Sequence, residues 1–224
     1  MKTNVRFVSF EVLLFSMILL LLVPTLVSGN WLPPISRLLY SFTMIACLYL
    51  VSSERRQLVT GLVLFLPAVV TGWQLVPMAA INQLMSYAIF QCVFLLYVMG
   101  TVYRYLMTSR IIDKEILYAS VVLYLMFGLT MGLLYFMILL AAPDTFGGDI
   151  AINTTDPDAL AATMQELLYF SFVTQTTLGY GDLSPVLPFA RVVATFQAII
   201  GQLYIAVVVA RLVGIHIATS SSPD

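Results

Sequence analysis

The sequence predicts an all-α membrane protein with six transmembrane helices and one shorter re-entrant segment, and three observations lead to this fold class. Among its 224 residues, 61% are hydrophobic and 9% are charged, whereas a soluble domain carries about a quarter charged residues. Six apolar runs approach or exceed the roughly 20 residues that a helix needs to cross a bilayer. The breaks between the runs are short and rich in turn-forming residues. We therefore expect the bilayer to be the solvent of this chain.

The six candidate spans follow one another along the chain. They are residues 7–27, 35–51, 58–73, 79–103, 116–141 and 189–213. The first span follows Lys2 and Arg6 and so resembles a signal peptide. It is longer than the usual apolar region of such a peptide, and the Ser-Gly-Asn after it is a poor cleavage site. We therefore expect this span to be retained, and we expect Pro67 to kink the third span.

A seventh apolar stretch, residues 160–174, is too short to cross the bilayer and polar at its end. It predicts a re-entrant helix. The segment before it, residues 143–158, is acidic and contains no basic residue, which predicts a polar extracellular turret. Within it, Asp156 followed by Pro157 is typical of an N-cap with proline at the first helical position.

The basic residues predict the orientation of the spans. With an even number of spans both termini share one side, and that side holds eight of the ten lysines and arginines. They are Lys2, Arg6, Arg55, Arg56, Arg104, Arg110, Lys114 and Arg211. The positive-inside rule therefore places both termini of this multi-pass cell-membrane protein in the cytoplasm. Trp31 and Trp73 then lie at the outer interface, where indole rings are favoured.

The most informative segment, residues 176–182, reads Thr-Thr-Leu-Gly-Tyr-Gly-Asp and lies between the re-entrant stretch and the last span. A cation that enters a membrane needs replacements for its hydration oxygens. Backbone carbonyls can replace them if they all point to one side, and the angles this requires favour glycine, as at Gly179 and Gly181. The carbonyls expected to coordinate the ion are those of Thr177, Leu178, Gly179, Tyr180 and Gly181. The hydroxyl of Thr177 can add the innermost oxygens.

This segment, which ends in Asp182, resembles the selectivity filter of the tetrameric potassium channels, whose familiar form is Thr-Val-Gly-Tyr-Gly. The likeness extends over residues 117–213 and implies a potassium-selective channel of the six-span type found in prokaryotes. In that family a pore helix, here residues 160–174, directs its negative C-terminal end at a cavity. Because one chain supplies one filter strand, the resemblance implies a homotetramer. It implies K+ in the filter, membrane lipids as partners and no other cofactor.

The last span carries two further features of the family. Gly201, 19 residues after Asp182, matches the gating hinge of many members. One face of the same helix is implied to line the cavity and the inner gate. Its residues are Gln202, Ile205, Val209 and Val213. Plain helix packing is the alternative for this face.

The sequence also departs from the family pattern. Tyr169 and Phe170 stand where many members have two tryptophans, so Phe170 has no donor with which to brace Tyr180. Leu178 replaces a more usual valine, and Val173 stands where some members have an acidic partner of the filter aspartate. None of these changes removes a carbonyl ring, so we expect selectivity for K+ to persist.

Other classes fit the motif less well. The last four residues of the motif also read Gly-x-Gly-Asp, as in intramembrane aspartyl proteases, which need two neighbouring aspartates. The nearest partner, Asp113, is predicted on the opposite side of the membrane from Asp182. We therefore expect that this protein is not such a protease and is not an enzyme. Nonselective cation channels often lack the tyrosine present here as Tyr180, and potassium transporters with four filter repeats carry four such loops in one chain. No basic cluster indicates a nucleic-acid partner.

The first four spans invite comparison with a voltage sensor. Such a sensor needs arginines at every third position of its fourth span, but residues 79–103 contain none and Arg104 stands alone. We therefore expect these helices to brace the pore or to mediate assembly. The predicted division is a four-helix domain without sensor arginines at 1–107, a cytoplasmic linker at 108–115, a pore domain at 116–217 and a polar cytoplasmic tail at 218–224.

Overall fold

The computed structural model describes residues 8–27, 31–52, 55–75, 80–109, 113–147 and 157–220. Seven α-helices are present in these ranges, together with one 3-10 turn and two very short strands. The α-helices are α1 (Val8–Leu26), α2 (Leu32–Val51), α3 (Arg55–Gly72), α4 (Ala80–Thr108), α5 (Lys114–Ala141), α6 (Pro157–Gln175) and α7 (Pro188–Ser220). The smaller elements are η2 (Pro143–Thr145), β1 (Phe146–Gly147) and β2 (Ser184–Pro185). Each predicted apolar segment is thus a helix.

The helix ends follow local chemistry. The carboxylate of Asp113 accepts a hydrogen bond from the backbone N–H of Ile116 (3.0 Å) and so caps the start of α5. The helix ends at Ala141, shortly before Pro143. The predicted start of α6 at Pro157 is confirmed, whereas Asp156 and the turret residues 148–156 lie outside the described residues. The last helix runs on to Ser220, into the predicted polar tail, because no glycine or proline interrupts it after Gly214.

Four helices contain segments long and apolar enough to cross a membrane, counted over the described ranges. These segments are Pro34–Val51, Ile81–Thr108, Lys114–Ala141 and Pro188–Arg211. The apolar part of α1, Phe10–Pro24, is shorter. The third helix begins with Arg55, Arg56 and Gln57, which lower its hydropathy, and it continues through Pro67. The chain is therefore a largely helical, multi-pass membrane protein.

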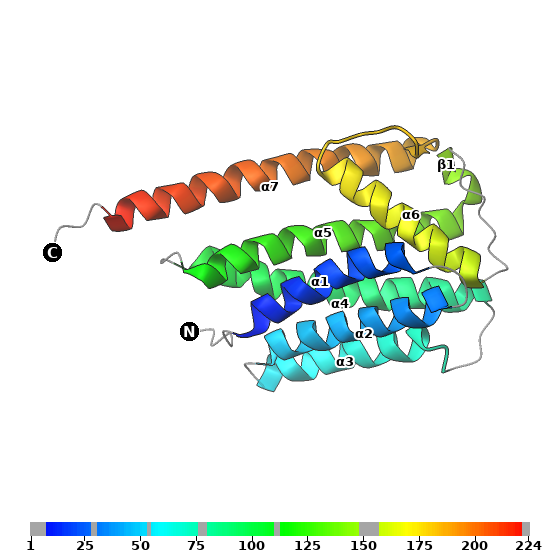
Figure 1. Cartoon of the computed structure of the whole chain (residues 1–224), viewed down its shortest axis with the longest axis horizontal. Coiled ribbons are helices and arrows are strands. Elements are labelled where there is room, and N and C mark those ends of the chain that lie inside the picture. Colours follow the sequence, from blue (N-terminus) through cyan, green and yellow to red (C-terminus); the bar gives the residue numbers. More distant parts are fainter. Residues whose placement is uncertain are drawn as a thin grey trace.

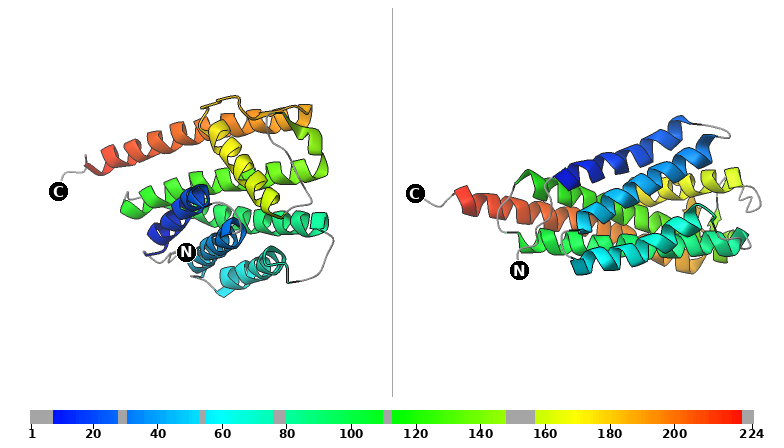
Figure 2. Two further views of the ribbon diagram at one scale, coloured as in Figure 1. Left: turned by 45° about the vertical axis from the view of Figure 1, so that its right-hand side comes forward. Right: turned by 90° about the horizontal axis from the view of Figure 1, so that it is seen from below.

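The helices form a bundle in which α5 is central. Helix α1 packs on α2 and α5, α3 packs on α4, and α4 packs on α5 (Figures 1 and 2). The start of α1 and the end of α7 lie at the same end of the molecule (Figure 1). The C-terminal part of α7 extends beyond the start of α5 (Figure 1).

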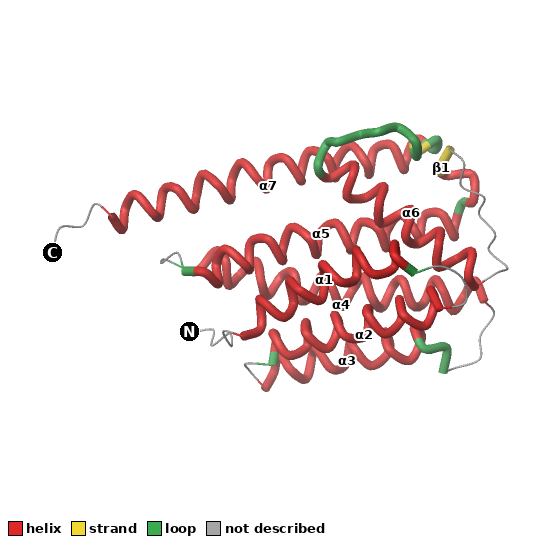
Figure 3. The backbone as a smooth tube through the Cα atoms, in the orientation of Figure 1, coloured by secondary structure: helices red, strands yellow, loops and turns green. Residues whose placement is uncertain are grey.

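Helix α6 and the loop after it have a distinctive path. The helix starts at the end of the bundle opposite to the start of α1, crosses α5 obliquely and stops partway along the molecule (Figures 1 and 3). The loop that follows returns to the end where α6 began, and α7 starts there. At that end β1 and β2 pair antiparallel, with Phe146 opposite Pro185 and Gly147 opposite Ser184. The motif of residues 176–182 lies in this returning loop.

Candidate functional site

The loop begins with a tight turn at the C-terminus of α6. The backbone N–H of Leu178 donates to the carbonyl of Val173 (2.9 Å). The N–H of Thr177 donates to the carbonyl of Thr174 (3.0 Å). This pair of bonds defines a Schellman cap, whose C′ residue is normally a left-handed glycine. Here the C′ residue is Thr177, with φ of 59°.

Left-handed residues recur at every second position of the loop. Thr177, Gly179 and Gly181 have φ of 59°, 58° and 82°, whereas Leu178 and Tyr180 do not have positive φ. In an ordinary strand successive peptide units flip, but residues that alternate between the two hands keep successive peptide dipoles aligned on one side. A Cβ on Gly179 or Gly181 would meet no atom within 4 Å. Glycine is therefore favoured at these positions by the backbone angle and not by lack of space.

The sequence predicted the ion-facing oxygens of Thr177 but not its left-handed backbone angle. A β-branched residue with positive φ is an outlier that costs about 1–3 kcal/mol and is found mainly at functional sites. Its hydroxyl donates to the carbonyl of Thr176 (2.6 Å) and accepts a hydrogen bond from the amide of Gln202 (3.2 Å). Two predicted site residues, Thr177 and Gln202, are thereby brought together. The other residues of the predicted face are exposed and lie further along α7: Ile205, Val209 and Val213.

The large apolar side chains of the loop are exposed on the surface of the subunit. Leu178 is 55% exposed and Tyr180 is 67% exposed. The helix beneath them is well packed, since Leu167, Ser171 and Gln175 are completely buried. A rigid helix therefore presents a loop with large exposed apolar side chains, as expected where further protein chains pack.

Gly201 lies where α7 crosses the end of α6. A Cβ at this position would be 2.4 Å from the carbonyl oxygen of Gln175 and 3.0 Å from its Cγ. Only glycine permits this approach without displacement of the backbone of α6. The structure thus gives Gly201 a packing role, while the predicted hinge stays a prediction.

Asp182 ends the motif and is held by two donors. The hydroxyl of Tyr169 donates to its Oδ2 (2.7 Å), and the backbone N–H of Leu183 donates to its Oδ1 (3.0 Å). The hydrogen bond from Tyr169 lowers the pKa of the Asp182 carboxyl, and the same bond raises the pKa of Tyr169 to about 12. Sequence analysis missed this contact, although a tyrosine at the place of a family tryptophan was a usable signal, because both carry a donor.

Phe170, the other departure from the family pattern, is buried and does not face the loop. Its ring lies 4.9 Å from that of Tyr135 and 5.2 Å from that of Phe146, both in edge-to-face contact. These aromatic rings connect α6 to α5 and to β1. Phe170 therefore anchors α6 to α5 and β1.

A buried polar network ties α6 to α7 and was not anticipated. The amide nitrogen of Gln197, a fully buried residue, donates to the carbonyl (3.0 Å) and the hydroxyl (2.8 Å) of Ser171. Its amide oxygen accepts a hydrogen bond from the hydroxyl of Tyr135 on α5 (2.6 Å). All three helices of the site are thus joined through one glutamine side chain.

The network continues towards the end of α6. Gln175, which is also fully buried, donates from its amide nitrogen to the carbonyl of Tyr124 (2.8 Å). The hydroxyl of Ser171 donates to the carbonyl of Gly128 (2.7 Å). In an apolar surrounding each such group needs a partner, so the network fixes the place where the loop begins. The sequence signal was two glutamines within apolar runs.

The far end of the loop is anchored beside the short strand pair. The N–H of Val186 donates to the carbonyl of Thr145 (2.7 Å), and Nε of Arg191 donates to the carbonyl of Pro185 (3.0 Å). The loop is therefore held at both ends, by α6 at one and by η2 and α7 at the other.

A contact at the opposite end of the molecule joins α7 to α4. The guanidinium of Arg211 donates to the carbonyls of Leu106, Met107 (2.9 Å) and Ser109 (3.1 Å). These carbonyls end α4, where a cation also compensates the helix dipole. Arg211 lies between Val209 and Val213 in the sequence, so the predicted gate segment is attached to the end of α4.

Part of the chain is similar in sequence to known proteins. Residues 115–216, from the start of α5 to near the end of α7, match the family described as ion channel. This part of the chain is therefore similar to ion channel domains. A curated relative, the potassium voltage-gated channel protein shk-1 of Caenorhabditis elegans, is 40% identical over 58 residues, which are 26% of this chain and 11% of the relative.

The two matches confirm the predicted relationship to the potassium channel family and indicate a channel and not an enzyme. The chain spans only about a tenth of the length of the curated relative that it matches. No solved structure matches the chain.

Proposed function

We propose that this chain is one subunit of a homotetrameric channel that conducts K+ passively through a filter of backbone carbonyls. One observation carries the proposal: left-handed φ alternates along Thr177–Gly181 within the expected motif. This pattern aligns successive carbonyls on one side of the loop. A column of such oxygens replaces the hydration shell of a K+ ion.

Four chains are needed to surround the ion, because one chain supplies one column. The exposed side chains of Leu178 and Tyr180 support assembly, since a monomer would leave them uncovered. The C-terminus of α6, with its negative dipole end, would face the cavity beneath the filter. The hydroxyl of Thr177 would add the innermost oxygen, held in place by Gln202. K+ is the bound ion, and no cofactor is proposed.

The proposed architecture has six spans, α1 to α5 and α7, with α6 as a re-entrant pore helix. Both termini would be cytoplasmic, which agrees with the positions of the start of α1 and the end of α7 at one end of the molecule (Figure 1). Residues 1–107 would form the four-helix domain, 108–115 the linker, 116–217 the pore domain and 218–224 the tail. Arg104 is the one arginine within α4, so no voltage-sensing series is proposed.

The cavity and gate would be formed by the exposed face of α7 that carries Gln202, Ile205, Val209 and Val213. In a tetramer these faces would converge around one axis. Val209 and Val213 would then form an apolar constriction that stops conduction by excluding water. Gly201 would be the point where α7 bends.

The test is K+ flux into liposomes that contain the purified protein. We expect wild type to pass K+ far better than Na+. We expect Gly179→Ala to abolish flux, because alanine resists the left-handed angle, while native mass spectrometry still detects the tetramer. Val63→Ala, on the exposed face of α3, is the control and should conduct normally. Equal Na+ and K+ flux, a purely monomeric protein or a conducting Gly179→Ala variant would each contradict the proposal.

A further inference from the structure

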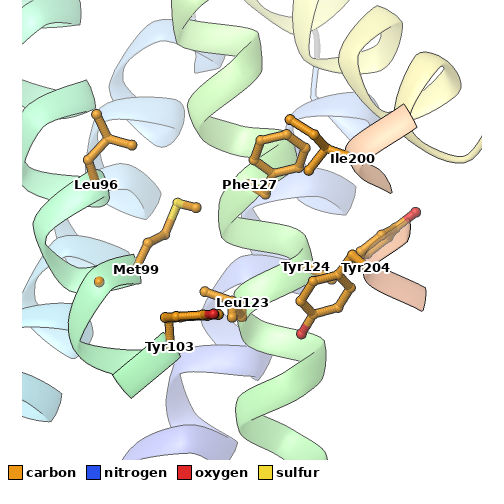
Figure 4. Close-up of a pocket in the computed structure, with 9 residues that line it drawn as sticks. Leu96, Met99, Tyr103, Leu123, Tyr124, Phe127, Ile200 and Tyr204 are labelled. Atoms are coloured by element: carbon orange, nitrogen blue, oxygen red, sulfur yellow. The ribbon is translucent and has the colours of Figure 1, made fainter. Parts of the chain in front are cut away.

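A cavity of about 300 Å³ lies between the four-helix domain and the pore helices. It is lined by Leu96, Met99 and Tyr103 of α4, by Phe127 of α5 and by Ile200 of α7, among others. Figure 4 shows Met99 extending from α4 towards α5, with Phe127 and Ile200 together on the other side. This cavity plays no part in the proposed conduction path.

The wall of the cavity includes a glycine of α4. A Cβ on Gly100 would meet no atom within 4 Å, so a larger side chain there would extend into empty space. Leu96 is 52% exposed and Ile200 is 46% exposed, which makes the cavity open to the protein surface. An occupant can therefore enter from the surrounding medium.

The cavity offers an occupant apolar surface but few free polar groups. The hydroxyl of Tyr204 donates to the carbonyl of Ser120 (2.7 Å), and that of Tyr124 donates to the carbonyl of Gln175 (3.4 Å). Both tyrosines thus present their rings while their hydroxyls are engaged elsewhere. A buried water needs two to four polar partners, so water is a poor occupant.

The three helices that line the cavity are all long and apolar enough to cross a membrane. Where the surface of these helices faces neither the proposed pore nor another chain, the surrounding medium is therefore hydrocarbon. An engineered apolar cavity of about 150 Å³ binds benzene, and this cavity has about twice that volume. Left empty, it would forfeit dispersion contacts along its lining. We propose that it binds one acyl chain of a membrane lipid as a wedge between α4 and the pore helices.

The position of this site connects it to conduction, a step that rests on the proposed function. Ile200 precedes Gly201, and Tyr124 donates to the carbonyl that ends α6. A bound acyl chain would hold these two residues in place, so emptying or overfilling the site should change K+ flux. A free hydrophobic molecule of similar size would compete for the same space.

Photochemical labelling tests the site without reference to flux. The protein is reconstituted in bilayers of phosphatidylethanolamine and phosphatidylglycerol that contain phosphatidylcholine with a diazirine near the end of one acyl chain. After illumination, peptide mass spectrometry locates the lipid adducts. We expect adducts to concentrate on residues 96–103. Gly100→Phe should remove most of them, whereas Val63→Phe, on the exposed face of α3, should leave them unchanged. Gly100→Leu repeats the test if the larger side chain prevents assembly.

Three outcomes would overturn the site. Adducts spread evenly over all exposed apolar residues would indicate ordinary lipid contact only. Adducts at 96–103 that persist in both Gly100 variants would show that the cavity is not their source. A benzophenone amino acid at position 96 that captures a second copy of the chain instead of lipid would show that protein fills the space. None of these outcomes bears on whether wild type conducts K+.

Discussion

The hydrogen bond between Tyr135 and Gln197 allows a quantitative test of the contacts that hold α6 and the proposed filter loop in place. The hydroxyl and the amide oxygen are 2.6 Å apart, and both side chains are fully buried. Replacing Gln197 with methionine keeps the length of the side chain but leaves the Tyr135 hydroxyl without this acceptor. An orphaned buried group costs about 1–3 kcal/mol in soluble proteins. Interhelical hydrogen bonds in a membrane protein average about 0.6 and reach about 1.7 kcal/mol.

From these ranges we expect a coupling free energy of about 1 kcal/mol between the two positions. Gln197→Met should cost more than this, since it also removes the bonds to Ser171. Adding Tyr135→Phe should then cost little, because the orphaned hydroxyl disappears. The measurement is unfolding by SDS in mixed micelles for the wild type, both single variants and the double variant.

A remote pair serves as the control. The hydroxyl of Tyr97 donates to the carbonyl of Gln57 (3.0 Å), in the four-helix domain. Tyr97→Phe and Gln197→Met should therefore add within about 0.5 kcal/mol. If Tyr135→Phe and Gln197→Met are equally additive, the bond does not stabilise the fold and the scaffold argument is wrong.

Two further predictions concern the ends of the pore. Arg211→Gln should weaken the contact between α7 and the last carbonyls of α4 by about 0.3–1 kcal/mol. The measurement is amide hydrogen exchange, which should become faster at the end of α4. Arg211→Lys should restore the contact in part. At the outer end, the hydrogen bond from Tyr169 lowers the pKa of the Asp182 carboxyl from its ordinary value of 3.8. The bond to the charged carboxylate therefore stabilises the loop at pH values above 3.8. This stabilisation is lost as the pH falls through the lowered pKa. Acid inactivation of K+ flux should therefore begin below pH 3.8 in wild type and at higher pH in Tyr169→Phe; identical profiles would refute this role.

The helices could be predicted from the sequence because each is marked by a long apolar run with turn residues at its ends. The predicted start of α6 at Pro157 and the end of α5 at Ala141 agree with the structure. The apolar run of the last predicted span ends at residue 213, and α7 continues beyond it to Ser220. Hydropathy predicts which part of a helix lies in the bilayer, whereas the end of the helix is predicted by stop signals such as glycine and proline.

The scaffold of the loop could not be predicted, because its contacts join positions far apart in the chain. Tyr135 and Gln197 are separated by 62 residues, and Ser171 lies between them. A polar residue in an apolar run shows that a partner exists but not which one. The left-handed angle of Thr177 was hidden for another reason: it results from the cap of α6, in a residue type that rarely adopts it.

Gly201 shows how one residue can satisfy two requirements. Its spacing from Asp182 matches the gating hinge of many potassium channels. Its contact with the carbonyl of Gln175 leaves no room for a Cβ, so glycine is also required for packing. In the structure α7 is one continuous helix through this position. Because the carbonyl that ends α6 occupies the space beside Gly201, a bend of α7 here must also displace that carbonyl. Residues 176–182, the proposed filter, directly follow α6. A bend of α7 at Gly201 and the geometry of this loop are therefore mechanically linked.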